Sequence, residues 1–141
     1  MQVFIAGVMQ GSRTDRQIVE QDYRQRIATA LEKHVPDVEI VDPWRLNPDS
    51  VNYDIDKARE TFKSFTAKAA DADVLIAYLP TASMGTAIEM WTAFGASKRI
   101  VVVSPLVHNW VIYVTADEVL PDLDSLIAAI EDGRFYTSVT R

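Results

Sequence analysis

Several residue types are missing or scarce in this sequence. Its 141 residues include no cysteine and only two histidines, His34 and His108. The absence of cysteine excludes disulfides, thiolate zinc sites and a cysteine nucleophile. Two histidines are too few for a site built from imidazole ligands, so we expect no bound metal.

Basic residues are also in the minority. The chain has 14 lysines and arginines against 20 aspartates and glutamates, a net charge of −6, and no basic run. This balance argues against DNA or RNA as the main ligand, because polymeric nucleic acid is bound through clustered positive charge. A small anion that meets one or two local arginines remains compatible with it.

Long apolar runs are missing as well. No stretch approaches the roughly 20 apolar residues of a membrane-spanning helix. The first residues lack the charged segment and cleavage site of a signal peptide. We therefore expect a cytoplasmic protein that does not engage a membrane.

What the chain contains is typical of one globular domain. Apolar residues make up 48% and charged residues 24% of it, close to the globular average. A chain of this length buries a core without crosslinks. No repeat, low-complexity tract or linker is visible, so the expected domain spans residues 1–134 and is followed by a polar tail at 135–141.

Strand-like and helix-like segments alternate along the chain. The continuous apolar run at 73–79 indicates a strand that is buried on both faces, as in a parallel sheet. The alternation predicts a single α/β domain, flavodoxin-like or Rossmann-like, with a mostly parallel sheet flanked by helices. The expected strands are 2–8, 38–41, 73–79 and 99–103, and the expected helices are 15–34, 55–70, 85–96, 108–114 and 123–131.

Ligands bind in such folds outside the carboxyl ends of the strands, which points to residues 9–13, 42–47, 80–89 and 105–109. In the third of these, Gly85 allows close backbone approach, and Glu89 is a candidate carboxylate nucleophile near the start of a helix. The alternative is structural. Thr86 and Glu89 have the spacing of a capping box, in which the glutamate bonds the helix cap.

The loop after the first strand is a candidate anion site. It has neither the dinucleotide-binding glycine pattern nor the lysine of a Walker A loop. Gly7, Gly11, Ser12 and Arg13 can still present backbone N–H groups and a guanidinium to an anion. An ordinary turn with a solvated arginine is equally compatible with this composition.

Two further loops contain candidate binding residues. After the second strand, Trp44 is suited to stack on a flat base and Asp42 to accept a hydrogen bond from it. Alternatively, Trp44 covers the edge of the sheet. After the fourth strand, Asn109 is suited to bind a hydroxyl group.

The segment SMGTAIE at 83–89, preceded by ADVLIAYLP at 72–80, resembles the nucleoside 2-deoxyribosyltransferase superfamily. This superfamily includes the 2′-deoxynucleoside 5′-phosphate N-hydrolases. The segment GVMQGSR at 7–13 resembles the first loop of these hydrolases. The resemblance implies that Glu89 attacks the anomeric carbon of the deoxyribose and forms a covalent intermediate. A second base or water then takes the sugar with retention of configuration. No cofactor is implied.

The resemblance also implies roles for other residues. Ser83 matches the position that contacts the 5′ end of the sugar, and Gly11 and Arg13 match positions near the phosphate in the hydrolases. Asn109 resembles an asparagine that transferases supply from a neighbouring subunit. A homo-oligomer, at least a dimer with a shared active site, is therefore expected. The apolar run at 110–113 suits such an interface, although ordinary core is the alternative.

The sequence departs from the family pattern at two positions. Phe65 stands where the family usually has an aspartate near the leaving base, and Phe4 stands where the hydrolases have a tyrosine. Asp42, Asp54 or Asp56 are alternative acids on the base side.

Three functions follow in order of preference. The first is transfer of 2-deoxyribose between nucleobases, with side hydrolysis. The second is N-glycosidic hydrolysis of a 2′-deoxynucleoside 5′-monophosphate. The third is a non-catalytic nucleotide-binding domain.

Overall fold

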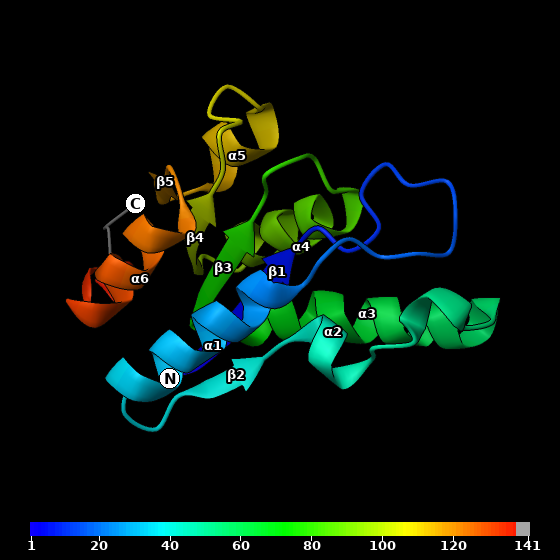
Figure 1. Cartoon of the computed structure of the whole chain (residues 1–141), viewed down its shortest axis with the longest axis horizontal. Helices are drawn as coiled ribbons and strands as arrows, with labels where there is room; N and C mark the ends of the chain where they lie inside the picture. Colours follow the sequence, from blue (N-terminus) through cyan, green and yellow to red (C-terminus); the bar gives the residue numbers. More distant parts are fainter. Residues whose placement is uncertain (138–141) are drawn as a thin grey trace.

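A computed structural model of the chain describes residues 1–137 and contains a five-stranded sheet (Figure 1). All four neighbouring strand pairs are parallel, and the strand order is β2-β1-β3-β4-β5. The predicted α/β fold class is confirmed. The strands are β1 Gln2–Gly7, β2 Glu39–Val41, β3 Val74–Tyr78, β4 Arg99–Val103 and β5 Glu118–Leu120.

The sheet has one strand more than the sequence predicted. β5 pairs with β4 in the register Val101–Glu118 to Val103–Leu120. It has only three residues and includes the charged Glu118, so it lacks the apolar run that identified the other strands. Arg99 on β4 bonds Glu118 with Nη2 at 2.7 Å, which stabilises this edge pairing.

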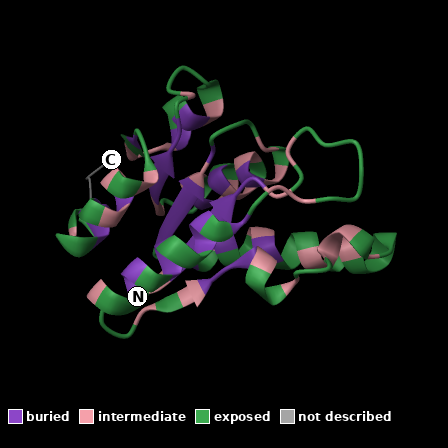
Figure 2. Ribbon diagram, in the orientation of Figure 1, coloured by how far each residue is buried: buried purple, intermediate pink, exposed green. Residues whose placement is uncertain are grey.

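Helices cover both faces of the sheet. Consecutive strand residues point to opposite faces and are apolar on both, so each face needs a cover. Val3, Ile5 and Ile76 pack under α1 and α6, whereas Phe4 and Leu75 pack under α3, α4 and α5. Figure 2 shows the buried strands enclosed by helices whose outer faces are exposed. The helices are α1 Asp22–His34, α2 Pro43–Leu46, α3 Ile55–Asp71, α4 Met84–Gly95, α5 Trp110–Thr115 and α6 Leu123–Glu131, with short 3₁₀ helices at Ser50–Asn52 and Arg134–Tyr136.

The helix expected at 15–34 begins only at Asp22. Before it, residues 9–20 form an irregular loop. Its inner end is held by Gln21, whose side-chain amide donates to the carbonyls of Val8 and Val19 at 3.0 and 2.8 Å. These side chain–backbone bonds compete with helix formation. The loop between β1 and α1 is therefore longer than the sequence indicated.

The end of the described chain is more tightly packed than expected. We expected 135–141 to be a loosely held polar tail, but Phe135 is fully buried against the α1–α6 core and stacks edge-on with Tyr136. The core therefore continues past residue 134. Residues 138–141 lie outside the described part. No helix within residues 1–137 is long and apolar enough to cross a membrane.

The strand order creates one crevice at the carboxyl edge. The connections leaving β1 and β3 go to opposite faces of the sheet, since α1 lies on one face and α4 on the other. Such a switch point is where open α/β sheets bind ligands. Gly7 ends β1 there and pairs with Tyr78 at the end of β3.

Replacing Gly7 with alanine tests the packing of this crevice. A Cβ on Gly7 would collide with the Tyr23 hydroxyl and would lie 2.8 Å from its Cζ. We expect Gly7→Ala to lower the free energy of unfolding by about 1–3 kcal/mol, as overpacking does. Gly95→Ala is the matched control. Its added Cβ meets nothing within 4 Å, so it should be neutral or gain up to about 1 kcal/mol from helix propensity. Equal stability of the two variants in chemical denaturation would contradict this account.

Candidate active site

A cavity of about 380 Å³ opens at the switch point. Its walls come from the end of β1 and the following loop, and from the first turn of α1. The start of α2, the segment between α2 and α3, the N-terminal two-thirds of α3 and the first half of α4 complete them. A concave, partly apolar space of this size suits a small organic ligand. The lining residues are Gly7, Met9, Gln10, Arg24, Pro43, Asn47, Ser50, Val51, Tyr53, Ala58, Thr61, Phe62, Phe65, Gly85, Thr86 and Glu89.

Glu89 enters the cavity from the second turn of α4. The cap of α4 is Ser83, whose Oγ accepts a hydrogen bond from the Thr86 amide at 3.3 Å. The capping-box alternative for Glu89 is therefore wrong, because a capping glutamate stands three residues after the cap. Among the described residues neither carboxylate oxygen of Glu89 has a hydrogen-bond partner. Its side chain is free to meet a ligand.

The environment of Glu89 changes its protonation. Burial raises the pKa of this carboxyl from 4.5 to about 7, while the positive charge of Arg24 partly opposes that rise. Desolvation penalises the ionised form, and a nearby cation favours it. At neutral pH both forms of Glu89 are therefore populated. The ionised form is a poorly solvated carboxylate, which is the state that a carboxylate nucleophile requires.

Arg24 is the second charged group in the cavity wall, and it is almost fully buried. Its Nη1 donates to the carbonyl of Ile5 and to Oδ1 of Asp42, each at 2.8 Å. Its Nε donates to Oε1 of Gln21 at 2.6 Å, and Nη2 reaches the Gly7 carbonyl at 3.3 Å. These four bonds use four of the five guanidinium donors.

Tyr23 lies beside Arg24, with the guanidinium carbon 5.1 Å from the centre of its ring. Its hydroxyl donates to the carbonyl of Val8 at 3.3 Å, and its ring packs on Tyr78 with the centroids 4.4 Å apart. Burial, the largest cause, raises the pKa of the phenol to about 12. Tyr23 therefore remains neutral. Its ring occupies the space that the missing side chain of Gly7 leaves open.

Part of the cavity wall is aromatic. Phe62, Phe65 and Tyr53 line it, and the Tyr53 hydroxyl donates to Oδ1 of Asn47 at 2.6 Å. Flat apolar rings of this kind suit a planar heterocycle. Glu89 is the sole carboxylic acid among the lining residues of this described part of the chain.

The three aspartates considered as substitutes for a base-side acid have other partners. Asp42 is paired with Arg24 and caps α2. Asp54 caps α3 by accepting from the Lys57 amide at 2.8 Å, and Asp56 pairs with Arg59. Each carboxylate is thus used in a local structural contact.

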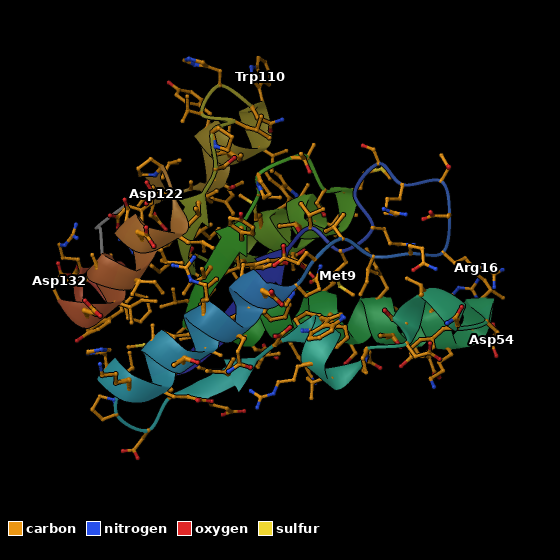
Figure 3. All side chains as sticks on the ribbon, in the orientation of Figure 1. Met9, Arg16, Asp54, Trp110, Asp122 and Asp132 are labelled. Atoms are coloured by element: carbon orange, nitrogen blue, oxygen red, sulfur yellow. The ribbon has the colours of Figure 1, made fainter. Side chains whose placement is uncertain are left out.

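The first loop is brought only partly to the cavity. Gly7 lines it, as do Met9 and Gln10, which belong to the predicted binding segment 9–13 but were not individual candidates. Gly11, with a positive φ of 58°, Ser12 and Arg13 follow farther out, and Arg13 is paired with Asp15 at 2.6 Å. Figure 3 shows this loop extending outward from Met9 toward Arg16.

The remaining predicted residues lie in three different places. Gly85 lines the main cavity. Trp44 lies in α2 outside the cavity lining, with its buried Nε1 lacking a hydrogen-bond partner among the described residues. Ser83 and Asn109 line a separate cavity of about 170 Å³ between α4 and α5, where Asn109 caps α5 through the Val111 amide.

Sequence reasoning missed Arg24, although a signal for it exists. Arg24 stands in one stripe with Ile27, Ala28 and Leu31, which is the i, i+3, i+4, i+7 pattern of a buried helix face. A charged residue at the end of such a stripe is buried only with partners. The pattern therefore indicates an internal ion pair, but it does not identify Asp42 as the other member.

Comparison with solved structures finds the same fold in known proteins. A 2-deoxyribosyltransferase from Bacillus psychrosaccharolyticus matches with a TM-score of 0.66 and 13% identity, over 92% of this chain and 96% of that one. A CMP N-glycosidase from Clostridium botulinum matches with a TM-score of 0.57 and 16% identity, over 93% and 98%. A conserved protein from Enterococcus faecalis V583 matches with a TM-score of 0.63 and 16% identity, over 94% of this chain and 98% of that one.

No protein-family model matches the chain, and no curated protein matches it in sequence. At these identities the structural likeness establishes a shared α/β fold over almost the whole length of the proteins compared. It agrees with the resemblance that the segments at 72–80 and 83–89 indicated.

The raised pKa of Glu89 predicts a pH-dependent effect of Glu89→Gln on stability. Between pH 4.5 and 7 the folded protein holds this proton more tightly than the unfolded chain. The free energy of unfolding of the wild type therefore falls as pH rises from 4.5 through about 7. Glutamine has no such loss. The variant should therefore gain stability relative to the wild type between pH 4.5 and 8, by up to about 3 kcal/mol.

Urea denaturation at several pH values measures this difference. Glu60→Gln, which changes an exposed glutamate of α3, is the matched control and should show a flat difference. A flat difference for Glu89→Gln as well would mean that the carboxyl is not desolvated.

Proposed function

We propose that the protein is a retaining enzyme that transfers 2-deoxyribose from a 2′-deoxynucleoside to another nucleobase through Glu89, with water as a slower acceptor. The observation that carries the proposal is the Glu89 carboxylate, free of hydrogen bonds among the described residues, in a cavity with an aromatic wall. The sequence resemblance at 83–89 and the fold of a 2-deoxyribosyltransferase support the same chemistry.

In the proposed first step, an oxygen of ionised Glu89 attacks the anomeric carbon of the deoxyribose. The C–N bond breaks, and its electron pair goes to the departing base, which takes up a proton. A glycosyl ester on Glu89 results. In the second step a nitrogen of the incoming base attacks the same carbon and loses its proton, and Glu89 leaves as the carboxylate. Two inversions give net retention.

The cavity suits the two ends of such a substrate. The wall of Phe62, Phe65 and Tyr53 is matched to the base, and the polar Asn47 and Thr61 line the same cavity. Arg24 and Glu89 form the charged end. A volume of about 380 Å³ accommodates a nucleoside-sized ligand that remains partly open to solvent.

Hydrolysis of a 2′-deoxynucleoside 5′-monophosphate is the second candidate. It is favoured by the fold of a CMP N-glycosidase and by Arg13 in the loop that begins at the cavity. Arg13 can exchange Asp15 for a phosphate at little cost, since their salt bridge is exposed and therefore weak. A non-catalytic nucleotide-binding domain ranks third, because the Glu89 motif is complete.

Mass spectrometry of the protein mixed with a 2′-deoxynucleoside tests the reaction. We expect a deoxyribosyl adduct on the peptide containing Glu89, together with base exchange when a second free base is added. Glu89→Gln should lower base release by at least a thousandfold, because it removes the nucleophile.

Parallel samples with 2′-deoxynucleoside 5′-monophosphates separate the candidates. An adduct that forms only from the monophosphates, and is lost in Arg13→Ala, would favour hydrolysis. Ligand-induced thermal stabilisation without base release from either substrate would favour the third candidate, a non-catalytic nucleotide-binding domain.

We also propose that the protein is a homo-oligomer with a composite site. Exposed apolar side chains of α4 and α5, which we call the α4–α5 face, suit an interface between copies. Asn109 lines no part of the main cavity of its own chain, so any contact with the substrate would come from a neighbouring copy. Figure 3 shows Trp110 projecting from the outer end of α5. The face comprises Ile88, Trp91, Trp110, Tyr113 and Val114, of which Trp110 is 83% and Tyr113 77% exposed.

Sedimentation of a Trp110→Ser/Tyr113→Ser variant tests this interface. We expect the wild type to sediment as a dimer or larger species and the variant to shift toward the monomer, because about half or more of the interface energy usually rests on a few aromatic residues. Ile55→Ser, at another exposed apolar position, is the control and should not dissociate the protein. A monomeric wild type would contradict the proposal.

A further inference from the structure

Arg24, which lines the same cavity as Glu89, belongs to a buried ion pair with a role that neither the fold nor the sequence motif assigns. Asp42 was expected to meet the base, yet it does not line the cavity. Its Oδ1 lies 2.8 Å from Nη1 of Arg24 and also accepts from the Trp44 amide at 3.1 Å. Both members of the pair are almost fully buried, so solvent screens their charges poorly.

The charged surroundings of Glu89 are simple. Among the described residues that line the cavity, Arg24, Tyr53 and Glu89 are the ones with ionisable side chains, and none of these described lining residues belongs to α5, β3 or β4. Tyr23, beside Arg24, is neutral because its pKa is about 12. Arg24 is thus the cation that acts on Glu89, and Asp42 is the anion bonded to that cation.

We propose that Asp42 is a positioning residue that acts on Glu89 through Arg24, by offsetting part of the guanidinium charge that stabilises the Glu89 carboxylate. Its catalytic consequence rests on the proposed function, whereas the electrostatic relation belongs to the free protein. The two members of the pair therefore have opposite effects. Loss of the Asp42 charge strengthens the field of Arg24 at Glu89, and loss of both charges removes that field.

The first variant is Asp42→Asn, which removes the charge and keeps the fold contacts. Asparagine caps helices as well as aspartate does, and its Oδ1 still accepts from Arg24 and Trp44. The Glu89 carboxyl is followed by ¹³C NMR during a pH titration, its signal being assigned by its loss in Glu89→Gln. We expect the midpoint to fall from about 7 by roughly half a pH unit or more.

The second variant is the double substitution Arg24→Met/Asp42→Asn. It leaves no unpaired buried charge, which single removal of Arg24 would do. Here the midpoint should rise above the wild-type value, because burial then acts on Glu89 without opposition. Asp122→Asn is the matched control, since Asp122 also caps a helix but lies outside the cavity, and it should give the wild-type midpoint.

The opposite directions of the two shifts separate an electrostatic role from a structural one. A purely structural contribution of Asp42 would leave the midpoint unchanged or move both variants the same way. An unchanged or raised midpoint in Asp42→Asn overturns the proposal, as does a lowered midpoint in the double variant. Should Asp42→Asn fail to fold, Asp42→Ser keeps a capping oxygen without charge and is judged by the same criterion.

A parallel assay of base release separates this proposal from the proposed function. Where the enzyme is active, the acidic limb of kcat/KM should move with the NMR midpoint, because that limb reports an essential base of the free enzyme. Opposite NMR shifts without base release in the wild type would refute the deoxyribosyl chemistry and uphold the role of Asp42. Base release by the wild type, together with an unchanged NMR midpoint in the variants, would uphold the deoxyribosyl chemistry and refute the role of Asp42.

Discussion

The buried guanidinium of Arg24 is the interaction on which the geometry of the site depends. Arg24 starts from α1, and its bonds reach two carbonyls near the end of β1 and the carboxylate that follows β2. An internal charge of this kind is tolerated only when its donors are satisfied. The first turn of α1, the end of β1 and the start of α2 are therefore fixed relative to one another.

That arrangement needs the switch point and a glycine. α1 and α4 lie on opposite faces of the sheet, so their side chains meet only beyond its carboxyl edge. At that edge Gly7 leaves room for the Tyr23 ring, which a larger residue would displace. Arg24 from one face and Glu89 from the other thus line one cavity. The pKa of Glu89 therefore depends on its burial in this cavity and on the charge of Arg24, and not on α4 alone.

The sequence predicted the features that depend on local pattern. β3 and β4 were predicted because continuous apolar runs mark strands that are buried on both sides. Glu89, which lines the cavity, was selected as a candidate because its neighbours form a recognisable segment. β5 was missed because three residues carry too little pattern, and the start of α1 was misplaced because Gln21 fixes the loop by side-chain bonds. Periodicity places Arg24 on the buried face of α1. It identifies neither Asp42 as the partner of Arg24 nor the residues of the aromatic wall, because both depend on contacts between distant segments.

The aromatic wall limits how the proposed chemistry works. Phe65 is buried in the wall where the family pattern has an aspartate, and the described cavity lining includes one carboxylic acid, Glu89. Under the proposed function the departing base receives its proton from solvent at the open side of the cavity. The rate then depends mainly on the Glu89 carboxylate, which forms the bond to the anomeric carbon. A desolvated Glu89 beside a partly neutralised arginine meets that demand, since poor solvation keeps the anion reactive while the cation keeps it populated.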